Sequence, residues 1–114
     1  MTTSIDNAIF SELRDTTGSD FVRELVDTFL VEAPTMLADL RDALAHGDAD
    51  RFRRAAHSLK SNSHTFGAVA LGNLAKDLEL TGLAAVAARG DQALAPITAE
   101  YARTATELEA LRDE

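Results

Sequence analysis

The chain has 114 residues, a formal net charge of −8 and 46% hydrophobic residues, and this length suits one compact domain better than two. It contains no cysteine, which excludes disulfide bonds, thiolate metal sites and cysteine nucleophiles. The negative charge argues against binding of nucleic acid or of an anionic membrane, because both need a positive field. We therefore expect a single domain over residues 1–114 whose partners are proteins or small molecules.

No segment of the sequence is typical of a targeting or membrane-spanning element. The first residues, MTTSIDNAIF, lack the basic start and the apolar run of a secretion signal. The longest apolar run, residues 83–88, is far too short to span a bilayer. These features predict a cytoplasmic protein, and we expect it to be a monomer.

The first two helices are predicted from apolar residues that recur at helical spacing. A short helix is expected near Ile5 to Leu13, capped by Asp6 and ending before Thr16. Ser19 or Asp20 is expected to cap a second helix that Pro34 bends or splits. The apolar stripe of this second helix comprises Phe21, Val22, Leu25, Phe29, Leu30, Leu37, Leu40 and Leu44. His46, Gly47 and Asp48 are then expected to form a turn, in which we expect His46 to have a structural role at the helix end.

Three further helical runs follow. A third helix opens at Asp48 or Asp50 and ends at Gly67. Its buried face is predicted to comprise Phe52, Ala55, Ala56, Leu59, Ser63 and Phe66. A fourth helix starts at Ala68, with a possible break at Gly82, and a last one spans Asp91–Arg112. No alternating strand pattern is present, so the fold class is all-α, an up-down antiparallel four-helix bundle with a short additional N-terminal helix.

The third helix carries an unusual outer face. With about 100° of rotation per residue, His57 falls roughly 150° away from the buried side. Around it on this outer face lie Arg53, Arg54, Lys60, Ser61 and His64. From Arg51 to Lys76 the sequence has five cations and no Asp or Glu. An electropositive patch on a negative domain suits an anionic group such as phosphate, or an acidic pocket on a partner.

The exposed imidazole of His57 could act as a nucleophile, since a phosphorylated ring nitrogen keeps a reactive nitrogen–phosphorus bond. On helical spacing alone, a solvated stripe without function is the simpler interpretation. A shared zinc site is disfavoured, because two helical turns separate His57 from His64 by roughly 10 Å. A hydrolase triad with Ser58 is disfavoured as well, because adjacent helical side chains point about 100° apart. No glycine-rich phosphate loop is present that would indicate a kinase.

The segment HSLKSNSHTFGA, which begins at His57, resembles the signature of histidine-containing phosphotransfer (HPt) domains, commonly H-x-L-K-G-x-x-x-x-x-G-A. The matching positions are His57, Leu59, Lys60, Gly67 and Ala68. The likeness extends over about a hundred residues, which makes it more specific than a short motif match. One position departs from the signature: Ser61 stands where the family often has a glycine that lets the partner approach closely.

The resemblance implies a phosphorelay intermediate rather than an enzyme, with no kinase or hydrolase activity of its own. His57 would accept a phosphoryl group from the aspartyl phosphate of a response-regulator receiver domain and pass it to another receiver. Lys60 would balance the phosphoryl charge, and Gly67 would close the helix. The expected partners are receiver domains and a hybrid sensor histidine kinase.

Two expectations concern the rest of the site. The chain would have no cofactor of its own, and magnesium would arrive with the receiver. Contacts to the partner would come from Arg53, Arg54, Ser61 and His64. The alternative function is a helical interaction module that docks receivers or kinases without phosphotransfer.

Overall fold

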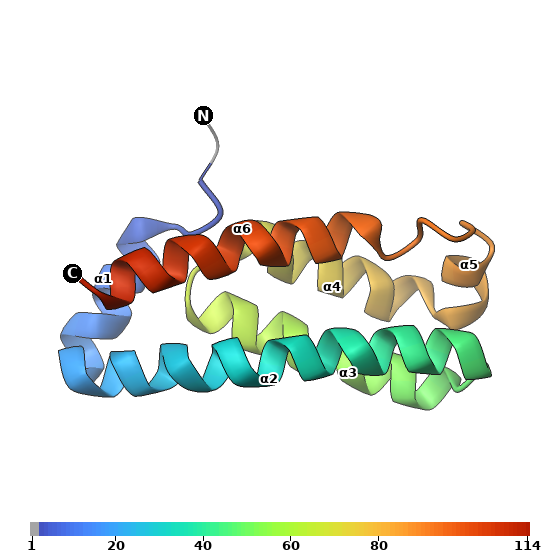
Figure 1. Cartoon of the computed structure of the whole chain (residues 1–114), viewed down its shortest axis with the longest axis horizontal. Coiled ribbons are helices and arrows are strands. Elements are labelled where there is room, and N and C mark those ends of the chain that lie inside the picture. Colours follow the sequence, from blue (N-terminus) through green and yellow to red (C-terminus); the bar gives the residue numbers. More distant parts are fainter. Residues whose placement is uncertain (1–2) are drawn as a thin grey trace.

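The computed structural model describes residues 3–114, which form six helices and no strand. Four long helices lie side by side, each antiparallel to the one before it in the chain (Figure 1). These four are α2 (Ser19–His46), α3 (Ala49–Thr65), α4 (Val69–Thr81) and α6 (Ala95–Arg112). Two short helices, α1 (Asn7–Thr17) and α5 (Leu83–Ala87), lie at opposite ends of the bundle (Figure 1). The predicted all-α four-helix bundle with an extra N-terminal helix is confirmed.

The helix starts follow the predicted capping residues in two of three cases. The Oδ1 atom of Asp6 accepts hydrogen bonds from the backbone N–H groups of Ala8 and Ile9, at 3.0 and 3.2 Å. The Oδ1 atom of Asp48 accepts one from the N–H of Arg51, at 3.1 Å. The cap predicted for α2 is wrong, because Gly18 occupies that position and no side chain bonds there.

Pro34 lies inside α2, so of the two predicted outcomes, a bend or a split, the split is excluded. A proline removes one backbone hydrogen bond from a helix. Here Pro34 is exposed, while Ala33 and Leu37 on either side of it are buried in the core. We infer that packing of these flanking residues keeps the helix continuous past the proline. Phe21 also departs from the predicted stripe: its neighbour Val22 is buried, and Phe21 itself is 50% exposed.

The boundaries of the other helices shift by a few residues. Helix α1 extends to Thr17, past the predicted end. Gly82, with a φ of +85°, separates α4 from α5, as the sequence suggested. The last helix begins at Ala95 rather than Asp91. Pro96 lies in the first turn of this helix and suits the later start. Its fixed φ matches a helix, and an N–H group at this position would have no hydrogen-bond partner within the helix, so its absence costs nothing.

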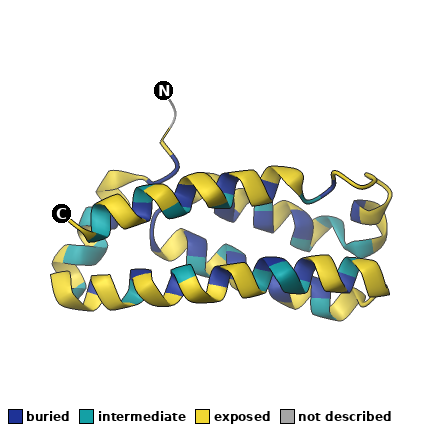
Figure 2. Cartoon of the chain, in the orientation of Figure 1, coloured by how far each residue is buried: buried dark blue, intermediate teal, exposed yellow. Residues whose placement is uncertain are grey.

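The core runs along the centre of the bundle (Figure 2). Every residue predicted for the inner face of α3 is buried: Phe52, Ala55, Ala56, Leu59, Ser63 and Phe66. The ring of Phe29 on α2 packs 5.3 Å from that of Phe66 and 6.2 Å from that of Tyr101 on α6. Helix α3 is therefore fixed along its inner face, and its outer face remains exposed. Among residues 3–114, no helix has the length and hydropathy needed to cross a membrane.

One core side chain leads to a stability prediction. The hydroxyl oxygen of Ser63 is buried without a hydrogen-bond partner, and such a group carries an uncompensated desolvation cost. We expect Ser63→Ala to raise the free energy of unfolding by about 1 kcal/mol, measured by urea denaturation. Ser58→Ala is the matched control, because it makes the same replacement at an exposed position of the same helix. A greater stability gain in the control would contradict the prediction.

Candidate functional site

His57 lies in the middle of α3 and faces outward, with 57% of its side chain exposed. Its Nδ1 atom lies 2.7 Å from the Oε2 atom of Glu79 on α4. One turn further along α3, the Nζ atom of Lys60 donates a hydrogen bond to the Oε1 atom of the same carboxylate, also at 2.7 Å. Glu79 thus holds both side chains, one on each oxygen. We call His57, Lys60 and Glu79 the His57 cluster.

The Glu79 carboxylate lies in a partly buried position, with 14% of its side chain exposed. The hydrogen bond from Lys60 lowers its pKa most, and the hydrogen bond from His57 and the charge of Lys60 act in the same direction. Partial burial acts in the opposite direction, but the pKa remains below the usual value for glutamate. Glu79 is therefore ionised at neutral pH and can only accept hydrogen bonds.

Sequence reasoning missed Glu79, although the spacing contains a signal for it. Helices α3 and α4 are antiparallel and meet at the turn around Ala68, and both rise by the same amount per residue. Residues equally far from Ala68 therefore lie level with each other. His57 and Glu79 are each eleven residues from this position.

The two arginines near His57 do not reach the cluster. The Nη2 atom of Arg53 lies 2.9 Å from Asp50 Oδ1, and the Nε atom of Arg54 lies 3.1 Å from Asp50 Oδ2. These contacts, with the hydrogen bond from Arg53 first, lower the pKa of Asp50. Residues three and four apart on a helix share a face. Asp50, which comes just before the cation-rich segment, therefore offsets the charges of Arg53 and Arg54. The predicted electropositive patch is consequently smaller than the charge count implied.

His64 and Ser61 occupy the same outer surface without touching Glu79. The His64 ring rests on the backbone of α4, since a Cβ atom added to Gly72 would come within 2.7 Å of its Nε2. Ser61 is exposed one turn beyond His57.

Among residues 3–114, no group of three or more His, Asp or Glu side chains is arranged to hold a metal ion. At the end of α2, the Nδ1 atom of His46 bonds to the carbonyl oxygen of Asp42, at 2.7 Å.

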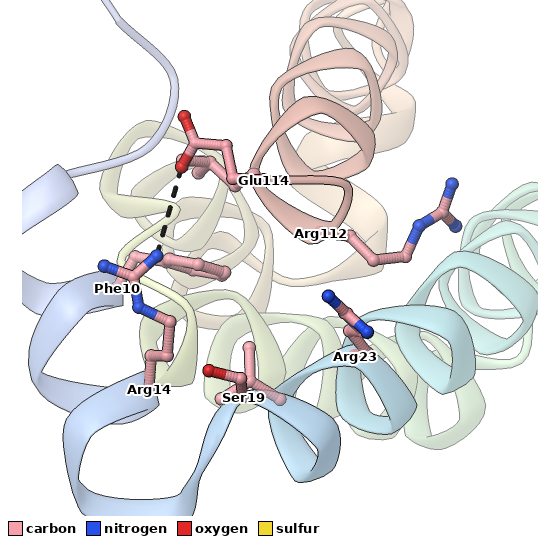
Figure 3. Close-up of a pocket in the computed structure, with 8 residues that line it drawn as sticks. Phe10, Arg14, Ser19, Arg23, Arg112 and Glu114 are labelled. Carbon is pink, nitrogen blue, oxygen red and sulfur yellow. Dashed lines mark ion pairs between the residues drawn. The ribbon is translucent and has the colours of Figure 1, made fainter.

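A pocket of about 190 Å³ lies elsewhere, where α1, the start of α2 and the end of α6 meet (Figure 3). It is lined by Phe10, Arg14, Ser19, Val22, Arg23, Leu111, Arg112 and Glu114. In Figure 3 the dashed line joins Arg14 to Glu114, at 3.9 Å. No member of the His57 cluster lines this pocket. His57 lies on the exposed surface of α3 instead, with 57% of its side chain exposed.

The comparisons with known proteins agree with this geometry. Residues 24–114 match the Hpt domain family. The crystal structure of histidine-containing phosphotransfer protein B (HptB) from Pseudomonas aeruginosa PAO1 is 28% identical in sequence, with a TM-score of 0.83. The alignment covers 99% of this chain and 97% of HptB. No curated protein sequence matches the chain.

The family match covers most of the chain, including α3, α4 and all three members of the His57 cluster. The similarity to HptB extends over essentially the whole length of both proteins. Hpt domains are phosphocarrier modules that interact with receiver domains and kinases. The chain therefore belongs to the Hpt domain family and has that family's role, histidine phosphotransfer in a phosphorelay.

Proposed function

We propose that His57 is the phosphoacceptor of this domain. It receives the phosphoryl group from an aspartyl phosphate of one receiver domain and passes it to an aspartate of another. The observation that carries this assignment is an imidazole that is 57% exposed, on a helix whose opposite face is fully packed. A group held on a rigid, accessible surface can meet a partner's reacting atom without first ordering a loop.

Phosphoryl transfer passes through a loose, in-line transition state, so positioning and charge neutralisation supply most of its catalysis. Helix α3 supplies the positioning. Lys60 supplies a positive charge one turn from His57, and it would move from Glu79 toward the incoming phosphoryl oxygens. The chain has no cofactor of its own in this proposal, and the receiver brings the magnesium ion that the reaction needs.

The receiver and the hybrid kinase would contact the outer surface around His57. Ser61 and His64 flank the imidazole on the C-terminal side of α3, and Arg53 and Arg54 lie on the N-terminal side. The Ser61 hydroxyl is small and exposed, so it leaves room for a partner and could donate a hydrogen bond to a phosphoryl oxygen. The domain works as a monomer and as a carrier, without kinase or hydrolase activity of its own.

The test is a labelling assay with a phosphorylated receiver domain. We expect the wild-type chain to acquire label that is labile in acid and stable in alkali, the behaviour of a phosphorylated histidine. A module that only docks receivers would bind the phosphorylated receiver without taking up label. Binding without label would therefore favour that alternative and contradict the proposal.

Lys60→Ala is expected to slow label uptake without abolishing it. The variant removes the cation that would bind the phosphoryl oxygens, and a hydrogen bond between charged groups contributes about 1.5–3 kcal/mol of stabilisation. We therefore expect the initial rate to fall by about 10- to 100-fold. Lys76→Ala removes the same charge from the facing helix and is expected to have a much smaller effect. Equal losses in the two variants would show that only the overall charge matters.

A further inference from the structure

We infer that the pocket between α1, α2 and α6 is an anion site that binds a phosphate group, either as the free ion or as part of a small molecule. The groups that recognise the phosphate are the guanidinium groups of Arg14 and Arg23. Five of the eight lining residues precede residue 24, where the match to the Hpt domain family begins. The site therefore lies largely outside the segment shared with that family, and it does not depend on the role of His57.

The first observation is the charge of the pocket lining. Each of the three helices contributes one arginine: Arg14 from α1, Arg23 from α2 and Arg112 from α6. Glu114 is the one carboxylate among the eight lining residues. Cations gathered around a hollow focus their field there and attract anions. This pocket therefore attracts an anion even though the chain as a whole has a formal net charge of −8.

The second observation is that two of these arginines are only weakly paired. The Nη1 atom of Arg14 lies 3.9 Å from Oε2 of Glu114, which is too long for a hydrogen bond. The Nη1 atom of Arg23 lies 3.9 Å from Oδ1 of Asp20. The side chain of Asp20 is fully exposed and that of Glu114 is 63% exposed, so water screens both pairs. Both guanidinium groups can therefore turn their planar fork of N–H donors to a phosphate.

Arg112 has a different part in the site. Its Nη1 atom donates to Asp27 at 2.9 Å, and its Nε atom donates to Asp113 at 3.1 Å. Neither of these carboxylates lines the pocket. Arg112 is thus fixed as a wall that adds positive charge, and the direct hydrogen bonds to the phosphate come from Arg14 and Arg23. Figure 3 shows these two arginines on either side of Ser19, with Arg112 and Glu114 above them.

The third observation is the size and the wall of the pocket. Its volume is about 190 Å³, whereas pockets for drug-sized ligands measure about 300–1,000 Å³. The buried side chains of Phe10 and Val22 form part of the wall. Apolar walls keep water out and so strengthen the attraction between a guanidinium group and an anion. The volume suits a phosphate ion or a small phosphate monoester.

The test is a titration of the full chain with inorganic phosphate, followed by NMR of the backbone amide groups. Sodium chloride keeps the ionic strength constant, so that general screening does not change during the titration. We expect saturable shifts at the amide groups of Arg14, Ser19 and Leu111, and none around His57. Shifts that do not saturate, or that do not occur at this pocket, would overturn the inference.

Three variants with the same change of charge show whether the pocket itself binds the phosphate. Arg14→Gln and Arg23→Gln should each raise the dissociation constant for phosphate by about tenfold or more, because each loses charge-assisted hydrogen bonds. Arg41→Gln is the matched control, since Arg41 is exposed near the other end of α2 and does not line this pocket. It should leave the dissociation constant unchanged. Equal weakening in all three variants would mean that only the net charge matters and would overturn the inference.

Glu114→Gln is expected to act in the opposite direction. It removes the carboxylate that competes with the phosphate for Arg14, so the dissociation constant should fall by about two- to fivefold. Unchanged or weaker binding in this variant would contradict the assignment. A parallel titration with glycerol 3-phosphate distinguishes the two sources of the phosphate group. Tighter binding than that of inorganic phosphate would support a small phosphorylated molecule as the ligand, and weaker binding would support the free ion.

Discussion

Replacing His57 by glutamine is expected to abolish phosphoryl uptake from a phosphorylated receiver. The amide nitrogen of glutamine has a delocalised electron pair and cannot attack phosphorus, whereas the imidazole nitrogen can. The side chain is exposed, so the stability of the fold should change by less than about 0.5 kcal/mol. Loss of label with an unchanged unfolding curve would therefore report on chemistry alone.

The matched control for this variant is His46→Gln. His46 lies in the last turn of α2, where its ring bonds to the carbonyl oxygen of Asp42. Because it is outside the His57 cluster, its replacement should leave label uptake at the wild-type level. Acid-labile label on the His57→Gln variant would show that another residue accepts the phosphoryl group.

Gly67→Ala is expected to produce the largest loss of stability among single methyl additions in this chain. Gly67 has a φ of +80°, a conformation that costs an alanine about 1–2 kcal/mol. The added Cβ would also lie 2.9 Å from the carbonyl oxygen of Asp6 and 3.0 Å from the Cβ of Ile9. Overpacking of this kind costs about 1–3 kcal/mol more. We expect a total loss of about 2–5 kcal/mol, measured by urea unfolding.

Gly47→Ala separates the two contributions. Gly47 ends α2 with a φ of +71°, and an added Cβ there would meet no atom within 4 Å. This control carries the backbone cost alone, about 1–2 kcal/mol. Gly67 also contacts the start of α1 through its backbone, because its carbonyl oxygen accepts a hydrogen bond from the N–H of Asp6 at 2.8 Å. Equal losses of stability in Gly67→Ala and Gly47→Ala would mean that the close contacts of the Cβ added at Gly67 contribute nothing.

Local sequence features predicted most of the fold, because helical spacing and capping are determined within a few residues. The face of α3 from Phe52 to Phe66 and the caps at Asp6 and Asp48 are examples. Of the two outcomes predicted for Pro34, a bend or a split, the split does not occur, and we infer that the buried residues Ala33 and Leu37 on either side compensate for the loss of one hydrogen bond. Local propensity does not include that packing.

In the candidate site too, the residues on one helix could be predicted from the sequence, whereas contacts between helices could not. The exposure of His57 followed from its angle on α3, and Lys60 followed from its spacing of one turn. Glu79 lies on a different helix, so it reaches His57 only through the antiparallel register of α3 and α4. The charge count failed for two reasons: its window began at Arg51, one residue after Asp50, which pairs with Arg53 and Arg54 on the same helix, and it could not include Glu79, which pairs with Lys60 from the facing helix.

The central claim is that a receiver's phosphoryl group moves to His57. The most direct test digests the labelled protein with trypsin and maps the phosphate in the peptide Ala55–Lys60, under alkaline conditions that preserve phosphohistidine. This peptide contains His57 and Ser58, so fragmentation distinguishes the two. We predict phosphate on His57 that is lost on acid treatment. Phosphate on Ser58, or on any peptide without His57, would contradict the account.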